Sequence, residues 1–118
     1  MIIAPSILSA DFGNLERDVH TIENDVDYLH VDIMDGHFVP NITFGPDVVA
    51  TIRKFTHLTL DCHLMIETPE KYVEQFIDAG GDIITVHVES TPHILRVIQL
   101  IKDKGAKAGI VLNPGTPL

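Results

Sequence analysis

Apolar residues follow two alternating spacings along the chain. Short apolar and β-branched runs, typical of buried strands, alternate with segments in which apolar residues recur every three or four positions, as in helices with one apolar side. The sequence therefore predicts the order strand, helix, strand throughout. The expected strands cover residues 2–8, 28–34, 58–65, 82–88 and 107–112.

Local signals at the ends of the helical segments support this order. Thr-Pro pairs at 68–69 and 91–92 predict a helix N-cap followed by proline at the first helical position. Gly80 and Gly105 stand where a left-handed glycine commonly ends a helix. One strand and one helix together take roughly 25 to 30 residues, close to the length of a βαβ unit. The expected sheet is therefore parallel, with right-handed crossovers that place every helix on one side.

Two neighbouring expected strands each have one apolar face and one face with polar side chains. Side chains on a strand point alternately to opposite faces, so every second residue shares a face. The residues on the polar face are His30, Asp32 and Met34 in the first of these strands and Asp61, His63 and Met65 in the second. The polar side chains can form a binding or catalytic site, whereas the apolar face can pack against helices.

A polar strand face without helices over it favours a closed barrel. In a (β/α)8 (TIM) barrel the inner strand faces meet at the centre, and the active site lies at the C-terminal ends of the strands. We therefore interpret residues 1–118 as a single partial α/β barrel domain with about five strands in a parallel sheet. A further Thr-Pro pair at 116–117 predicts another helix, so we expect truncation after the fifth strand. The alternative, a doubly wound sheet, would have helices over both faces.

The polar face also predicts a metal site. Neighbouring strands lie about 4.8 Å apart, so two imidazoles and a carboxylate on adjacent strands can reach one ion at the roughly 2.0 to 2.2 Å that zinc requires. His30, Asp32 and His63 are the expected ligands. His87 ends the fourth expected strand on the same face, and we expect a hydrogen-bonded structural residue there rather than a substrate contact.

The net charge of −9 narrows the choice of partners. Seventeen acidic against eight basic residues argue against nucleic acid and anionic membranes, which bind clustered Lys and Arg. No stretch approaches the roughly 20 apolar residues of a transmembrane helix, and the N-terminus does not resemble a secretory signal. Cys62 is the only cysteine, which fits a reducing compartment. We therefore expect a soluble, cytoplasmic protein.

Residues 35–45 form a longer connection than the 2 to 6 residues usual between a strand and a helix. This segment contains Phe38, Val39 and Phe44, whose large apolar side chains need cover. We expect the segment to be either a wall facing the substrate or a contact within a homo-oligomer.

The chain resembles the ribulose-phosphate 3-epimerase family in five segments: "APSILSADF", "HVDIMDGHFVPNITFGP", "DCHLMIETPE", "HVES" and "NPGTP". These segments occur in the family's order and at its spacing. The resemblance implies a (β/α)8-barrel isomerase that interconverts D-ribulose 5-phosphate and D-xylulose 5-phosphate. It also implies a small sugar phosphate as substrate and one divalent metal ion, Zn, Fe, Mn or Co.

Carried over residue by residue, the resemblance implies that His30, Asp32 and His63 bind the metal. It further implies that Asp32 is one of two carboxylates that act as acid and base. The residues implied to line the substrate site are Ser6, His63, Met34 and Met65.

In the family, the second carboxylate, the fourth metal ligand and the phosphate-binding loops come from later strands. We therefore expect the isolated 118-residue chain to be inactive as an epimerase and to be aggregated or oligomeric. Two alternatives stay open: an epimerase of a related ketose phosphate such as allulose 6-phosphate, and a non-catalytic metal-binding half-barrel.

Overall fold

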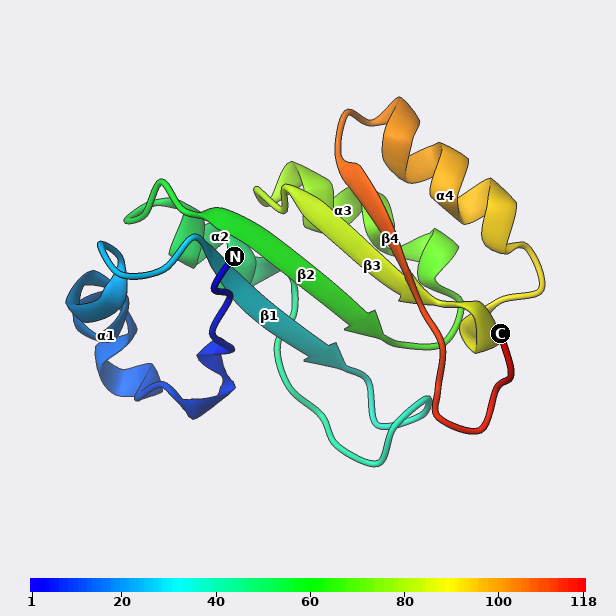
Figure 1. The fold of residues 1–118 in the computed structure, drawn as a ribbon, viewed down its shortest axis with the longest axis horizontal. Coiled ribbons are helices and arrows are strands. Elements are labelled where there is room, and N and C mark those ends of the chain that lie inside the picture. Colours follow the sequence, from blue (N-terminus) through cyan, green and yellow to red (C-terminus); the bar gives the residue numbers. More distant parts are fainter.

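Parallel strands form the centre of the fold in the computed structural model, which describes residues 1–118 (Figure 1). The strands are β1 (Tyr28–Met34), β2 (Thr59–Met65), β3 (Ile83–His87) and β4 (Lys107–Val111). Each pairs in parallel with the next along the chain, in the order β1-β2-β3-β4. The α-helices are α1 (Leu15–Ile22), α2 (Pro46–Arg53), α3 (Val73–Asp78) and α4 (Ile94–Asp103). Short 3-10 turns lie at Ile7–Ser9, Phe12–Asn14, Pro69–Lys71 and Val88–Ser90.

The helices pack against one face of the sheet. Figure 1 shows α2 and α3 behind the strands and α4 beside β4, and the alternate strand residues on the helix side are buried. The strand residues of this core are Leu29, Val31, Ile33, Leu60, Cys62, Leu64, Ile84 and Val86. The helix residues of the core are Val19, Val49, Ile52, Val73, Phe76, Val97 and Ile101. The expected α/β fold with a parallel sheet is confirmed, and the doubly wound alternative is wrong because the other face has no helix.

The most N-terminal of the five expected strands does not form as a strand. Its backbone runs beside β1, where Ile3 O accepts a hydrogen bond from Asp27 N and Pro5 O accepts one from His30 N, both at 2.9 Å. One isolated parallel bridge, between Ser6 and His30, joins the two segments. Pro5 has no N–H to donate, and the Ile3 N–H donates to the Asp27 carboxylate. A regular ladder therefore does not develop, and four of the five expected strands are present.

The expected N-caps of the third and fourth helices are wrong in position. Thr68 has a left-handed backbone (φ 51°) and makes no capping hydrogen bond, and the proline after it opens a 3-10 turn ahead of α3. Thr91 Oγ1 accepts a hydrogen bond from His93 N at 3.1 Å, and α4 begins only after His93. The expected C-terminal glycines are confirmed, because Gly80 (φ 117°) and Gly105 (φ 88°) follow helix ends in left-handed backbone.

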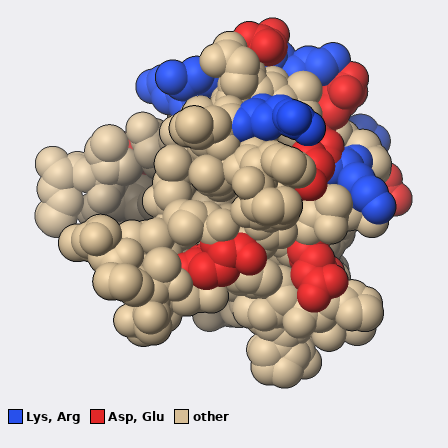
Figure 2. All heavy atoms as spheres, turned by 90° about the vertical axis from the view of Figure 1, so that its right-hand side faces the viewer, with Lys and Arg blue, Asp and Glu red and all other residues tan.

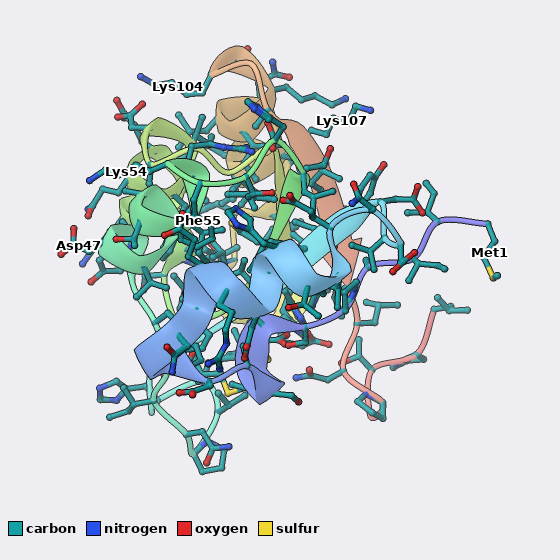
Figure 3. All side chains as sticks on the ribbon, turned by 90° about the vertical axis from the view of Figure 1, so that its left-hand side faces the viewer. Met1, Asp47, Lys54, Phe55, Lys104 and Lys107 are labelled. Carbon is teal, nitrogen blue, oxygen red and sulfur yellow. The ribbon has the colours of Figure 1, made fainter.

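Charged side chains are distributed unevenly over the surface. On the face in Figure 2 the basic side chains gather toward the upper end with acidic side chains among them, and the lower part has acidic side chains only. That face therefore has no continuous basic surface. Figure 3, drawn from the opposite side, shows Asp47 and Lys54 on the helix layer and Met1 projecting away from the body of the protein. None of the helices combines the length and the apolar character needed to cross a bilayer.

We expect Leu64→Ala to lower the free energy of unfolding by about 2–5 kcal/mol, because it opens a cavity between the sheet and the helices. Leu64 is fully buried, whereas Leu95 on α4 is 80% exposed. Leu95→Ala is the matched control and should change stability by no more than about 0.5 kcal/mol. Urea unfolding followed by circular dichroism measures both values. Equal losses in the two variants would contradict the assigned core.

Candidate metal and catalytic site

The register between β1 and β2 decides which side chains meet on the open face of the sheet. His30 lies opposite Asp61, and Asp32 lies opposite His63. Because side chains alternate between faces along a strand, all four point away from the helix layer. The polar residues that the sequence places on alternate strand positions are therefore neighbours in space.

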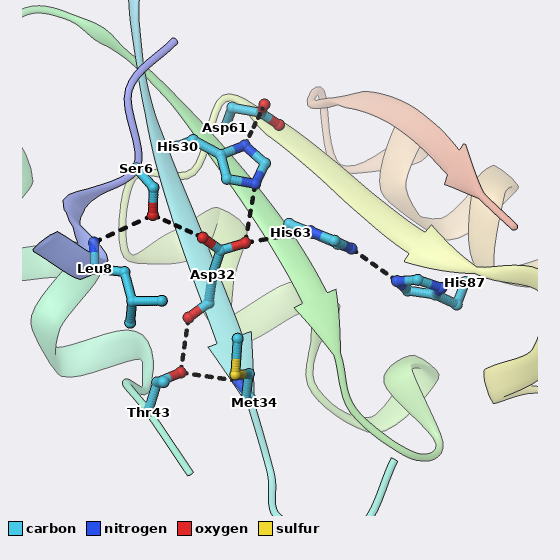
Figure 4. Close-up of polar contacts among 9 residues, drawn as sticks. All are labelled: Ser6, Leu8, His30, Asp32, Met34, Thr43, Asp61, His63 and His87. Carbon is cyan, nitrogen blue, oxygen red and sulfur yellow. Dashed lines mark hydrogen bonds and ion pairs between the residues drawn. The ribbon is translucent and has the colours of Figure 1, made fainter. Parts of the chain in front are cut away.

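His30, Asp32 and His63 converge on one point (Figure 4). His30 Nε2 lies 3.0 Å from Asp32 Oδ1, and His63 Nδ1 lies 3.3 Å from the same oxygen. One ligand atom from each residue lies within 4.8 Å of the other two, and all three side chains are half-buried. Two imidazole nitrogens and a carboxylate oxygen are a donor set that Zn²⁺ and similar divalent ions accept. The residues present therefore fit a divalent metal ion.

Asp61 holds the second ring nitrogen of His30. His30 Nδ1 lies 2.9 Å from Asp61 Oδ2, so a proton on Nδ1 is donated there and Nε2 is left to face an ion. Carboxylates commonly orient metal-binding histidines in this way. The hydrogen bond to Asp61 raises the pKa of His30; burial opposes the rise, and the negative charge of Asp32 adds to it. The sequence places Asp61 on this face, but its partner becomes visible only in the structure.

The pKa of His63 is shifted in the opposite direction. Burial lowers it, and positive charge on His87 or His30 lowers it further, against the opposing effect of Asp32. His63 is therefore favoured in the neutral form, which is the form that binds metals. Its second nitrogen, Nε2, lies 2.7 Å from His87 Nε2. The expectation that His87 is hydrogen-bonded is confirmed.

The two oxygens of Asp32 have different surroundings. Oδ1 faces the two histidines, whereas Oδ2 accepts a hydrogen bond from Ser6 Oγ at 2.7 Å. Ser6 Oγ in turn accepts a hydrogen bond from Leu8 N at 3.2 Å, which restrains the hydroxyl. The irregular N-terminal segment thus brings Ser6 to the site without forming a strand. Sequence reasoning missed Thr43, whose hydroxyl donates to the backbone oxygen of Asp32 at 2.7 Å.

Met34 and Met65 lie opposite each other where β1 and β2 end, and both are half-buried. The 35–45 connection turns back beside them, since Thr43 N donates to Met34 O at 3.0 Å. The Phe38 ring of this connection lies 5.0 Å from the His87 ring. This contact with the open face of the sheet supports the expectation that the 35–45 connection forms a wall beside the site.

Asp35 ties the 35–45 connection to the connection that follows β2. Its carboxylate accepts hydrogen bonds from His37 N (2.9 Å), Phe38 N (2.8 Å) and Glu67 N (2.8 Å). Burial raises the pKa of Asp35, but the three hydrogen bonds outweigh it, and the net shift is downward. Sequence reasoning missed this role. The Asp-Gly pair signalled only the two local hydrogen bonds, because aspartate hydrogen-bonds nearby backbone in turns and Gly36 has a positive φ of 76°.

We expect His30 to titrate above the ordinary imidazole pKa of about 6.5 in the metal-free protein. Asp61→Asn should lower the pKa of His30, because a neutral amide stabilises the imidazolium less than a carboxylate does. Asp78→Asn, an exposed change on α3, is the control and should leave the pKa of His30 unchanged. NMR titration of the ring protons measures all three proteins.

Because the pKa of His30 is raised, protonation of this residue stabilises the folded protein, and the free energy of unfolding depends on pH. The contribution is fully present below the unfolded-state pKa of about 6.5 and is lost as the pH rises through the folded-state pKa. A wild-type pKa of His30 at or below the ordinary value would contradict the assigned Asp61 contact.

Comparison with known proteins supports a family assignment. The model of the ribulose-phosphate 3 epimerase family matches residues 2–118. The chain is 56% identical over 117 residues to the ribulose-phosphate 3-epimerase of Bacillus subtilis, covering 98% of the chain and 54% of that protein. It is 56% identical over 121 residues to the ribulose-phosphate 3-epimerase of Synechocystis (100% and 53% covered) and to the chloroplastic ribulose-5-phosphate-3-epimerase of Arabidopsis thaliana (100% and 43%). The chain spans about half the length of the curated relatives it matches. It belongs to the ribulose-phosphate 3-epimerase family.

Proposed function

We propose that the chain supplies the metal-binding half-site and one acid–base carboxylate of a ribulose-phosphate 3-epimerase, which interconverts D-ribulose 5-phosphate and D-xylulose 5-phosphate. The observation that carries the proposal is the Asp32 carboxylate, which faces two imidazoles with one oxygen and a serine hydroxyl with the other. Relatives named as ribulose-phosphate 3-epimerases support the same reaction.

The proposed reaction explains why these residue types lie together. Epimerisation at C3 removes a proton beside the C2 carbonyl, and negative charge then develops on the enediolate oxygens. His30, Asp32 and His63 would hold a divalent ion, which would supply a Lewis acid for this charge. We assign Asp32 Oδ2 as the oxygen that accepts the C3 proton, because Oδ1 is the oxygen that faces both histidines. Inversion at C3 also calls for a second acid–base group on the opposite side of the substrate.

The remaining assigned residues line the substrate side of the site. Ser6 lies beside the proposed proton-accepting oxygen and restrains it through the 2.7 Å hydrogen bond. Met34 and Met65 offer polarizable surface that does not titrate, which disfavours water near the intermediate. We also assign His63 to the substrate contacts.

The proposal also covers three further properties: the metal, the oligomeric state and the location in the cell. The donor set of His30, Asp32 and His63 is compatible with Zn, Fe, Mn or Co. A homo-oligomer is supported by Ile42, which lies on the 35–45 connection and is 80% exposed. A cytoplasmic location is supported by the buried, unpaired thiol of Cys62, which suits a reducing compartment.

We expect His63→Ala to reduce the affinity for Zn²⁺ by more than tenfold, because it removes one of three converging ligand atoms. His57→Ala is the matched control: His57 is exposed, and its loss should leave metal binding unchanged. Competition with a chelator and elemental analysis of the purified proteins measure affinity and content. Equal metal content and affinity in wild type and His63→Ala would contradict the site.

We expect Asp32→Asn in the full-length protein to slow C3 proton exchange by about 10²–10⁴-fold, because asparagine does not accept the proton. Ser6→Ala should cost less, since Asp32 keeps its carboxylate. Exchange of the substrate's C3 hydrogen with solvent deuterium is the assay, at saturating metal and with bound metal quantified. Near wild-type exchange in the metal-loaded Asp32→Asn variant would exclude Asp32 as the base. Faster turnover of D-allulose 6-phosphate than of D-ribulose 5-phosphate would replace the proposed substrate.

A further inference from the structure

His87 lies on the far side of His63 from Asp32. The Nε2 atoms of the two histidines are 2.7 Å apart, and the ring planes differ by only 18°. His63 points its other nitrogen, Nδ1, at Asp32 Oδ1 (Figure 4). His63 is therefore held at both ring nitrogens, by the carboxylate on one side and by a second imidazole on the other.

His87 itself is fixed by its surroundings. His87 is only 5% exposed, and the centre of the Phe38 ring lies 5.0 Å from the centre of the His87 ring. Its Nδ1 is buried without a hydrogen bond of ordinary length, and the nearest partner is Glu89 Oε1 at 3.5 Å. Glu89 is anchored in turn, since its other oxygen accepts a hydrogen bond from Asn113 N at 2.8 Å. A hydrogen bond from the Thr116 side chain lowers the pKa of Glu89 and keeps it an acceptor.

The short contact between the two imidazoles restricts where their protons lie. Two ring nitrogens 2.7 Å apart need one proton between them, since two protons or two lone pairs would repel. When His63 Nδ1 binds an ion, its only proton is on Nε2, so His63 donates and His87 Nε2 accepts. His87 then carries its own proton on Nδ1, which faces the Glu89 carboxylate. This arrangement places one proton between the two imidazoles and another on His87 Nδ1, which faces Glu89 Oε1 at 3.5 Å.

We propose, resting on the metal role proposed for His63, that His87 is a positioning residue for this ligand. It accepts the Nε2–H of His63 and thereby fixes the imidazole with Nδ1 directed at the ion. Glu89 and Phe38 hold His87 in the accepting orientation. His87 touches neither the metal nor the reacting atoms, so it acts only through His63. Partners of this kind commonly change metal affinity by 10–100-fold when they are removed.

The test compares three substitutions on β3 in the full-length protein. His87→Leu keeps a buried apolar side chain but removes the acceptor, and it should weaken Zn²⁺ binding by about 10–100-fold. His87→Gln keeps an acceptor in its amide oxygen and should retain most of the affinity. Val86→Ala is the control, because Val86 is fully buried on the opposite face of the same strand. It should lower stability without changing affinity. Chelator competition measures each affinity.

A second readout separates positioning from general damage. In the zinc-loaded wild type, the Nε2–H of His63 should give a slowly exchanging proton resonance, which His87→Leu should lose even at saturating Zn²⁺. Wild-type affinity in His87→Leu, or an equal loss of affinity in Val86→Ala, would overturn the role of His87 and leave the proposed function intact. A wild-type protein that binds no divalent ion would reject the metal proposal itself, and the role of His87 with it.

Discussion

The parallel register of β1 against β2 is the constraint on which the site depends. It puts Asp32 opposite His63 and His30 opposite Asp61, and a slip by one residue would turn each of these side chains to the helix face. The register is fixed on the apolar side, where alternate residues of both strands are fully or almost fully buried. Burying one such side chain contributes about 1.5–3 kcal/mol, whereas half-exposed ion pairs contribute about 1 kcal/mol or less. The core therefore determines the register, and the polar site is placed by it.

The surroundings of His30 and His63 shift their pKa values in opposite directions. Asp61 and Asp32 raise the pKa of His30, while burial and the neighbouring imidazoles lower that of His63. The raised pKa favours the protonated form of His30, which competes with a metal ion, whereas the lowered pKa favours the neutral form of His63, which can bind one. Proton competition at this site should accordingly arise at His30. The net charge of −9 also favours the approach of a cation over that of an anion.

The convergence of the proposed ligands could be predicted from sequence because it requires only a period of two and the adjacency of consecutive strands. His30, Asp32 and His63 meet both conditions. A period of two was not sufficient for the first expected strand, because Pro5 lacks the N–H donor that a ladder needs. The capping predictions at Thr68 and Thr91 failed because a Thr-Pro pair does not determine where the α-helix begins: a 3-10 turn follows Thr68, and α4 begins only after His93.

Contacts between distant segments had no local signal. Asp35 accepts a hydrogen bond from a residue 32 positions later, and His63 meets His87 across 24 positions. The first contact joins two loops whose paths the strand pattern does not specify. The contact between His63 and His87 could have been suspected, because both side chains lie on the same face of the sheet. The orientation of the two rings, however, decides whether their nitrogens form a hydrogen bond.

The site therefore rests on two kinds of support with different physical character. The proposed metal ligands project from paired strands, whose backbone is held by ladder hydrogen bonds and a buried core. Ser6 lies on the irregular N-terminal segment, and the 35–45 wall is tied to its neighbour by the carboxylate of Asp35. These loop groups depend on a few hydrogen bonds instead of a ladder, so their positions are easier to alter without unfolding the sheet. Substitutions among them are consequently expected to change the hydrogen bond on Asp32 Oδ2 and the loop surface beside the site, while the geometry of His30, Asp32 and His63 is preserved by the strands.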